Sequence, residues 1–347
     1  MNRFDIQERG NEHPVAIFLL VSFVVFAVLF LLVQATSGSE PQRPGADRAL
    51  DAGTPAGGGG SAEVLTLEPP PAPAIEVAAA AVPEAPAPEA PAAVNLAPTA
   101  PPPPVSASAY AIVDRSCGAL DFGFNEHARL APASLTKIVT SLLVAQNASR
   151  LDEMVDIKVS GSQMRKEGSS IMGIEPGQKY SLRDLLYGLM LPSGNDAAMA
   201  IADYLGGGDV NRFVQMMNEQ AAALGMQDSQ FSNPHGLDSR TLYSSAYDMA
   251  LAGRAALDSP LLFDVSNARS WVTASGLSFK NGNKLLGSYP GADGVKIGFT
   301  NNAKQTIVAA AERDGRSIIV SVFGSEDRYA DSVALLDWAF AHVPSHC

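Results

Sequence analysis

Cysteine, histidine and aromatic residues are scarce in this chain of 347 residues, which has two cysteines, five histidines and 7% aromatic residues. No C-x-x-C pair and no H-E-x-x-H motif occurs, so the ligand spacings of common zinc sites are missing. No G-x-S-x-G turn occurs, which argues against a serine enzyme of the α/β-hydrolase type. Cys117 and Cys347 would be able to pair if the domain is exported, but the sequence leaves this open.

Positive charge is also in short supply. The chain has 24 Lys and Arg against 36 Asp and Glu, a formal net charge of −12. The acidic excess is spread along the chain, with 4 basic against 11 acidic residues in 1–107 and 20 against 25 in the remainder. No basic cluster stands out, so the sequence argues against nucleic-acid binding.

Long apolar runs are absent except near the N-terminus, where residues 15–33 are apolar apart from Ser22. Such a run is about 30 Å long as a helix, which matches the core of a bilayer. We expect a tail at 1–13 and an uncleaved transmembrane anchor at 14–35, with the rest of this single-pass protein outside the cytoplasm. Cleavage of a signal peptide near Ala35, followed by secretion, is the alternative.

Residues 36–107 hold about two thirds of the 24 prolines and a run of four glycines. This composition lacks the apolar mass that offsets the entropy of ordering, so we expect a disordered linker. Proline-rich spacers extend by ~3 Å per residue, which gives a reach on the order of 100–200 Å. The remainder, 108–347, has the composition and length of one globular domain.

The pattern of this domain predicts strands at both ends and helices between them. One sheet assembled from both ends, with a helical lobe inserted, satisfies that order. We expect strands at 108–114, 119–124, 269–274, 293–300, 305–313 and 316–324, and helices from Ser134 and at 181–191, 195–205, 209–225, 244–258 and 331–343.

A serine lies three residues before a lysine in the stretch APASLTK, which precedes an apolar run. Ser134 is a residue that often begins helices, and Lys137 would then lie on the wet face. Alternatively, the i, i+3 spacing places the two side chains next to each other as a nucleophile and its base. The apolar neighbours of Lys137 favour a buried amine with a lowered pKa.

Two further motifs carry polar side chains. In LPSGNDAA, Ser193 and Asn195 flank a glycine between two helices, although Asn195 could equally be an ordinary helix cap. In DGVKIGFT, Lys296 lies on an expected strand and is followed by Gly298, which indicates close approach of another backbone or a ligand. A solvated lysine on an edge strand is the alternative.

In order, S-x-x-K, S-x-N and K-x-G match the motif set of penicillin-binding proteins and serine β-lactamases. From about Ala107 to Val343 the chain resembles the low-molecular-mass D-alanyl-D-alanine carboxypeptidases, a family of serine peptidases. The resemblance rests on APASLTK, LPSGNDAA, SNPHGLD and NKLLGSYPGADGVKIGFT. It implies an α/β (α+β) fold, a mainly antiparallel sheet flanked by helices with an inserted helical lobe.

The resemblance also implies a role for each motif residue. Ser134 would form an acyl-enzyme with the penultimate D-alanine of a peptidoglycan stem peptide, and Lys137 would take its proton. Ser193 would relay a proton to the leaving D-alanine, and Asn195 would orient Lys137. Substrate binding would fall to Lys296, which attracts the terminal carboxylate, and to Gly298, Phe299 and Thr300.

The backbone N–H groups of Ser134 and Phe299 would form the oxyanion hole. No metal or cofactor is implied, and β-lactams would be acylating inhibitors. Release of the terminal D-alanine from stem pentapeptides is therefore the expected activity.

The sequence departs from the family at Ile297, where threonine is usual and where its hydroxyl helps to bind the carboxylate. A non-catalytic or weakly active peptidoglycan-binding or β-lactam-sensing module is therefore the main alternative. A class A β-lactamase would need a glutamate for deacylation, and Glu219 is the only glutamate between Asn195 and Lys296. A Ser-His-Asp enzyme would have to use His235 and Asp238.

Overall fold

The structure, a computed structural model, describes residues 97–345 and 347. The expected tail, the anchor at 14–35 and most of the linker lie outside the described residues. Within the described part, no helix is both long enough and apolar enough to cross a membrane.

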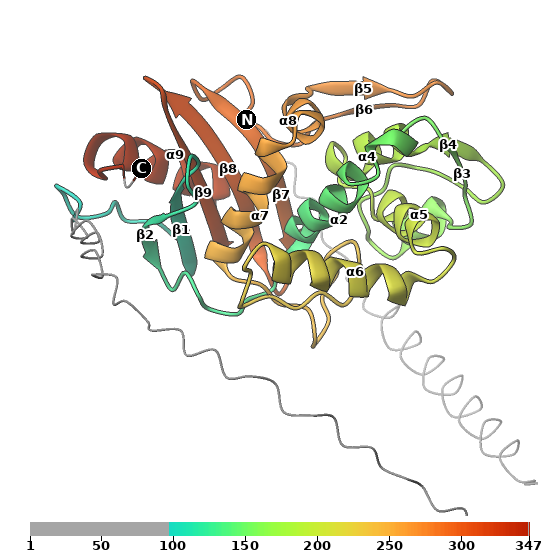
Figure 1. Ribbon diagram of the computed structural model, residues 1–347, viewed down its shortest axis with the longest axis horizontal. Coiled ribbons are helices and arrows are strands. Elements are labelled where there is room, and N and C mark those ends of the chain that lie inside the picture. Colours follow the sequence, from blue (N-terminus) through green and yellow to red (C-terminus); the bar gives the residue numbers. More distant parts are fainter. Residues whose placement is uncertain (1–96, 346) are drawn as a thin grey trace, which may run out of the picture. The chain divides into compact units, whose positions relative to one another are not determined.

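Five antiparallel strands form the central sheet, in the order β2-β1-β9-β8-β7 (Figure 1). The expectation that both ends of the domain share one sheet is thus confirmed. Between β8 and β9, Asp314 and Gly315 both have positive φ, as a two-residue hairpin turn requires. The strands are β1 (Ala109–Asp114), β2 (Leu120–Phe124), β7 (Ala292–Thr300), β8 (Lys304–Arg313) and β9 (Arg316–Ser325).

Both faces of this sheet are covered by helices. Helix α9 (Arg328–His342) lies on one face, and α7 (Ala246–Asp258) lies on the other (Figure 1). Neighbouring strand residues point to opposite faces, so Ile112 joins the apolar cluster under α9 while Ala111 joins the larger cluster on the side of α7. A sheet buried on both faces explains why β8 and β9 read as nearly continuous apolar runs.

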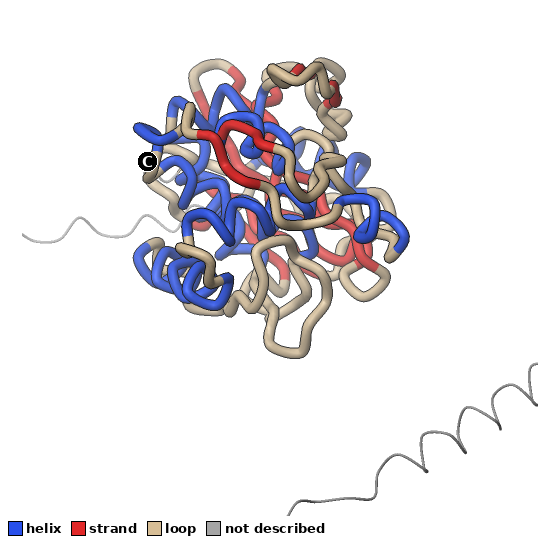
Figure 2. The backbone as a smooth tube through the Cα atoms, turned by 90° about the vertical axis from the view of Figure 1, so that its right-hand side faces the viewer, coloured by secondary structure: helices blue, strands red, loops and turns tan. Residues whose placement is uncertain are grey.

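The inserted lobe lies beyond the β7 edge (Figure 1) and is mostly helical, with loops around it (Figure 2). Ser181 caps α4 as expected, since its hydroxyl accepts the N–H of Asp184. The elements are α2 (Thr136–Ala145), η2 (Ala148–Arg150), β3 (Met154–Asp156), α3 (Gly161–Lys166), β4 (Lys179–Ser181), α4 (Leu182–Met190), α5 (Asn195–Leu205) and α6 (Val210–Ala223).

Several elements differ from the sequence prediction, which did not include β3, α3 or β4. The strand expected at 269–274 is the short β5 (Ser270–Val272), which pairs only with β6 (Ser278–Lys280) in a separate hairpin. Its tryptophan, Trp271, stacks on Tyr187 of α4, so packing outside the central sheet holds it. Helix α8 (Pro260–Asn267) was not expected, although Ser259 caps it and Pro260 occupies its first turn.

Residues near both ends of the domain are tied to its body. The backbone N–H of Thr99 donates to the carbonyl of His342, and the indole of Trp338 donates to the carbonyl of Ala100. Thr99 and Ala100 belong to residues 36–107, the segment whose composition predicts a disordered linker. A disulfide joins Cys117 to Cys347 across a sequence separation of 230 residues, with the two Cα atoms 6.2 Å apart.

Candidate active site

Ser134 and Lys137 lie where the chain enters the helical lobe. Ser134 belongs to the 3-10 turn η1 (Ala133–Leu135), directly before α2, and no side-chain cap is formed there. The Lys137 amine donates instead to the Ser134 hydroxyl at 2.9 Å. The serine is therefore paired with the lysine and does not act as a helix cap.

The Lys137 amine is enclosed by polar acceptors inside an apolar wall. Its side chain is 0% exposed. It donates to Asn195 Oδ1 and to the backbone carbonyl of His235, each at 2.7 Å. Burial lowers the pKa of Lys137 well below its ordinary value, the charge of Lys296 lowers it further, and Asp196 opposes both effects. The neutral amine is thereby favoured.

Ser193 and Lys296 form the second hydroxyl–amine pair. The Lys296 amine donates to the Ser193 hydroxyl at 3.0 Å and to the carbonyl of Ile297 at 2.9 Å. Lys296 is 2% exposed, so it is not the solvated lysine of an edge strand. Burial, followed by the charge of Arg328, lowers the pKa of Lys296 to about 7. Ser193 adopts a left-handed backbone, with φ of 63°, in the tight turn before α5.

Asn195 is the first residue of α5, and Gly194 occupies the cap position. The amide of Asn195 is therefore free to bond Lys137, which is separated from it by 58 residues in the chain. The interpretation of Asn195 as an ordinary helix cap is wrong because its side-chain oxygen points to the lysine and not to its own helix.

Strand β7 runs directly beside the backbone of Ser134. A Cβ atom at Gly298 would lie 2.9 Å from the Ser134 nitrogen and 2.5 Å from Thr306 Oγ1, so only glycine fits there. This is the close approach that a glycine within a strand indicates. Ala133, just before the nucleophile, has a left-handed φ of 49°, which alanine rarely adopts.

The motifs border a cavity of about 220 Å³. Ser134, Ser193 and Asn195 line it together with the Ile297–Thr300 part of β7. Phe299 is 58% exposed, which is unusual for a large apolar side chain and places a ring at the opening. Its lining residues are Ser134, Gly168, Ser169, Ser170, Ser193, Asn195, Gly236, Leu237, Ile297, Gly298, Phe299, Thr300 and Arg328.

Sequence reasoning missed two parts of this lining. Arg328, the first residue of α9, donates to the carbonyl of Gly298 at 2.6 Å and brings a positive charge to the cavity. The segment Gly168–Ser170 forms another wall. The sequence around Arg328 shows only the start of a helix, and Gly168–Ser170 reads only as GSS. Neither pattern indicates a site, because both parts reach the cavity only through the tertiary fold. Thr300, which was expected, bonds Asp238 through its hydroxyl at 2.9 Å.

A family model described as D-alanyl-D-alanine carboxypeptidase matches residues 96–327. The chain belongs to this family. It is 33% identical over 255 residues to the D-alanyl-D-alanine carboxypeptidase DacF of Bacillus subtilis, an alignment that covers 69% of this chain and 64% of the relative. With DacD of Salmonella typhimurium the identity is 36% over 257 residues, covering 71% and 65%. The matched region thus spans slightly less than two thirds of these relatives.

Solved structures of the same kind share the fold. The DD-transpeptidase of Streptomyces K15 superposes with a TM-score of 0.65 at 31% identity, covering 70% of this chain and 100% of that one. Penicillin binding protein 6B from Escherichia coli gives 0.63 at 34% identity, covering 70% and 79%. The expected penicillin-binding-protein fold is confirmed.

The residues that a class A β-lactamase or a Ser-His-Asp enzyme would need are not placed for catalysis with Ser134. Glu219 is exposed on α6 and does not line the cavity. The ring of His235 accepts the N–H of Leu237 through Nδ1, and Asp238 bonds Thr300, so the two do not form a relay to Ser134. Burial and the Lys137 charge lower the pKa of His235 to about 3, which keeps its ring neutral.

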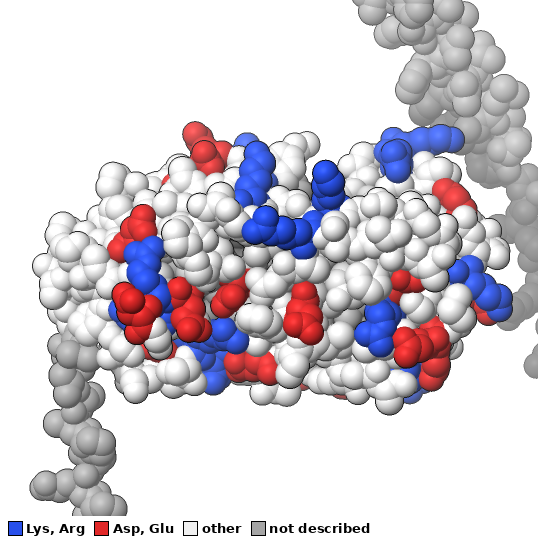
Figure 3. Space-filling view, turned by 90° about the horizontal axis from the view of Figure 1, so that it is seen from above, with Lys and Arg blue, Asp and Glu red and all other residues white. Residues whose placement is uncertain are grey.

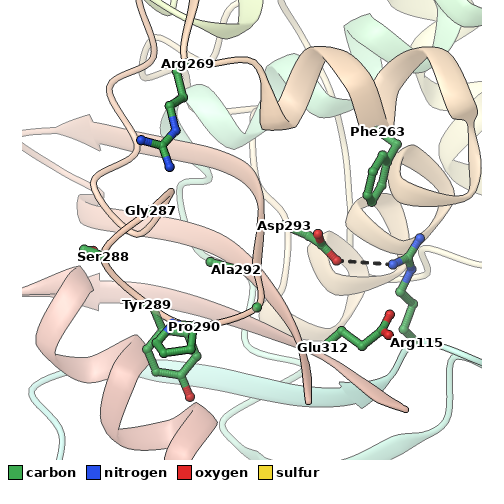
Figure 4. A pocket seen from close by; sticks show the side chains of 11 residues that line it. Arg115, Phe263, Arg269, Gly287, Ser288, Tyr289, Pro290, Ala292, Asp293 and Glu312 are labelled. Carbon is green, nitrogen blue, oxygen red and sulfur yellow. Dashed lines mark hydrogen bonds and ion pairs between the residues drawn. The ribbon is translucent and has the colours of Figure 1, made fainter. Parts of the chain in front are cut away.

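A second, larger cavity of about 920 Å³ lies at the other end of β7. Figure 4 shows Arg115 bonded to Asp293 there, with Arg269 extending over Gly287. The face around the β5–β6 hairpin gathers basic side chains (Figure 3), and residues 265–292 include three basic residues and no acidic one. None of the residues with an expected catalytic or substrate-binding role lines this cavity, so it is not the candidate active site.

One group of possible metal ligands occurs among the described residues: Asp114, Cys117 and Cys347. Its two sulfur atoms are joined in the disulfide, and thiolates are the form of cysteine that binds metals. This group also lies outside the cavity beside Ser134.

Proposed function

We propose that this protein is a serine D-alanyl-D-alanine carboxypeptidase that removes the terminal D-alanine from peptidoglycan stem pentapeptides. The observation that supports this most strongly is the buried Lys137 amine bonded to Ser134. A serine with a neutral amine at hydrogen-bond distance is an activated nucleophile. The names of the relatives support the choice of substrate.

Acylation begins with the Ser134 hydroxyl. A neutral Lys137 has two N–H groups and one lone pair. The two N–H groups donate to Asn195 and to the His235 carbonyl. In the neutral form the 2.9 Å contact with Ser134 is reversed, because the Ser134 hydroxyl then donates to the lone pair of Lys137. Ser134 Oγ attacks the carbonyl carbon of the penultimate D-alanine while its proton moves to Lys137 Nζ. The backbone N–H groups of Ser134 and Phe299 stabilise the oxyanion.

Departure of D-alanine requires a proton on its nitrogen. Ser193 gives its hydroxyl proton to this nitrogen and receives in return the proton that Lys137 took from Ser134, so that Lys137 becomes neutral again. The charged Lys296 favours the transfer through its bond to Ser193. The C–N bond breaks and leaves an ester on Ser134. Water then attacks the ester, which releases the shortened peptide and restores the serine hydroxyl. Nothing in this sequence of steps needs a metal or a cofactor.

Positive charges border the part of the cavity where the substrate carboxylate would lie. Lys296 and Arg328 both approach the β7 wall, and Thr300 offers a hydroxyl. Ile297 lines the same wall but cannot donate a hydrogen bond. We propose that the two cations bind the carboxylate without the missing threonine hydroxyl, so that the enzyme stays active with reduced specificity. Thr300 would join them by turning its hydroxyl from Asp238 to the substrate carboxylate. β-Lactams would acylate Ser134 by the same chemistry.

We propose further that residues 14–35 anchor the protein in the cell membrane, with the linker letting the domain reach the wall outside the cytoplasm. The length and apolarity of the run support this. Cell fractionation with and without residues 1–35 tests it. A truncated protein that remains firmly on membranes would rule the anchor out.

Release of free D-alanine tests the activity. The detergent-solubilised full chain and its Ser134→Ala variant are each incubated with a pentapeptide ending in D-Ala-D-Ala, and D-alanine is quantified. We expect release by the wild type alone. If the folded wild type binds the peptide but releases nothing, the protein is the non-catalytic binding or sensing module.

A further inference from the structure

One side chain accepts three consecutive backbone N–H groups of a wall segment of the cavity, residues 168–174. Residues 169–174 contain neither helix nor strand. The Asp196 carboxylate accepts the backbone N–H groups of Met172 at 2.7 Å, Gly173 at 2.7 Å and Ile174 at 3.1 Å. It also accepts the N–H of Ala197 at 2.9 Å. Three consecutive N–H groups of the wall segment thus depend on Asp196.

The hydrogen bonds use the full acceptor capacity of an ionised carboxylate. Oδ1 accepts from Met172 and Ala197, and Oδ2 accepts from Gly173 and Ile174. Asp196 is 0% exposed, and a buried charge is tolerated only where such partners compensate for lost water. An amide at this position would offer one acceptor oxygen and would set its own N–H groups against two N–H donors.

Asp196 also connects the wall segment to the catalytic turn. Its neighbour Asn195 donates its backbone N–H to the carbonyl of Ser170 at 2.9 Å, and the Asn195 side chain accepts from Lys137. The glycine before them makes room, because a Cβ at Gly194 would lie 2.8 Å from the Met172 nitrogen and 2.9 Å from Asp196 Oδ1. The same short stretch therefore fixes both the lysine and the wall.

We propose that Asp196 is a positioning residue that fixes the wall segment against the Ser193–Asn195 turn, so that Ser169 and Ser170 form a rigid side of the substrate cleft. This inference rests on the proposed carboxypeptidase function. Asp196 does not line the cavity and touches no reacting group. Its effect passes through the backbone of the wall segment to the bound peptide.

Two substitutions disturb this arrangement in different ways. Asp196→Asn keeps the size of the side chain and removes two acceptor positions. Gly161→Ala keeps every charge, but its Cβ would lie 2.6 Å from Asp196 Oδ2 and 2.8 Å from the Ile174 carbonyl oxygen. Asp114→Asn is the matched control. Asp114 is also a buried carboxylate, and it accepts the backbone N–H of Ser116 at 2.8 Å. It lies on β1 and does not line the cavity.

The experiment measures hydrogen exchange of residues 168–174, the melting temperature, and kcat and KM for D-alanine release, all with the full chain. We expect both wall variants to exchange faster in this segment and to lose about 10- to 100-fold in kcat/KM, mainly through a higher KM. Asp114→Asn should lower the melting temperature with neither effect. If Asp196→Asn fails to fold, Gly161→Ala carries the test.

Two results would overturn the inference. One is wild-type exchange and kinetics in both wall variants. The other is a loss of kcat/KM with unchanged exchange at 168–174, which would mean that Asp196 acts on Lys137 directly. Failure of the proposed carboxypeptidase function can be told apart from failure of this inference. In the first case the wild type releases no D-alanine, while hydrogen exchange at 168–174 still reports on Asp196.

Discussion

The amine nitrogen of Lys137 lies 2.9 Å from the hydroxyl oxygen of Ser134, and both residues come from one turn of chain. The other two partners of this amine, Asn195 and the His235 carbonyl, come from distant segments. Because these two acceptors take the N–H groups, the orientation of the lone pair towards the serine is set by the fold. This geometry fits the proposed roles of Ser134 as nucleophile and Lys137 as its base.

Replacing Lys137 by arginine tests whether a neutral base is required. Arginine keeps the positive charge but cannot lose its proton near neutral pH. We expect Lys137→Arg to slow acylation by a fluorescent penicillin by about 10²- to 10⁴-fold, the usual contribution of a general base. Circular dichroism of the variant is the control for folding. Acylation at nearly the wild-type rate would show that Lys137 does not act as the base.

The pH dependence of kcat/KM reports on Lys296. Its pKa of about 7 means that the amine loses its charge as the pH rises through neutrality. The carboxylate of the substrate then loses an attractive partner, so we expect kcat/KM to fall above about pH 7, towards tenfold for each further unit. The lowered pKa of Lys137 favours its base form over the same range.

Lys296→Arg provides the matched comparison, because arginine stays charged throughout this range. We expect its absolute rate to be lower and its alkaline decline to be shifted upward. D-Alanine release measured from about pH 6 to about pH 10 gives both profiles. A wild-type profile that stays flat across this range contradicts the assignment.

Restoring threonine at position 297 should improve the enzyme. A hydrogen bond to a charged group contributes about 1.5–3 kcal/mol, which corresponds to roughly 10- to 150-fold in kcat/KM. We expect Ile297→Thr to show a gain of this order with a peptide that has a free terminal carboxylate. The same peptide with an amidated C-terminus is the control and should show little gain. An equal gain with both peptides would exclude carboxylate binding as the cause.

Gly298 should tolerate no side chain. In Gly298→Ala the new methyl group would lie 2.9 Å from the Ser134 nitrogen, so β7 or the nucleophile must move. We expect a loss of about 10²-fold in kcat/KM, the scale of a 1 Å misplacement. Gly315→Ala is the control: its φ of 78° is also left-handed, but nothing lies within 4 Å. It should cost stability alone, and similar kinetics in both variants would contradict the prediction.

Local sequence determined those features that depend on neighbouring residues. The i, i+3 spacing brings Ser134 and Lys137 together, the hydroxyl of Ser181 begins α4, and an Asp-Gly pair turns β8 into β9. The apolar runs of β1, β8 and β9 were also predictable, because strands buried on both faces need them. The order of the three motifs indicated the family and, through it, the fold.

The tertiary structure alone decided which distant groups complete the site. Arg328 and the wall segment 168–174 carry no local signal strong enough to place them beside Ser134, since their positions follow from packing of α9 and from the hydrogen bonds of Asp196. The β5–β6 hairpin is separate from the central sheet, and its Trp271 packs on Tyr187 of α4. Burial of Lys296 is likewise a property of the packed fold, and it sets the charge state that catalysis would use.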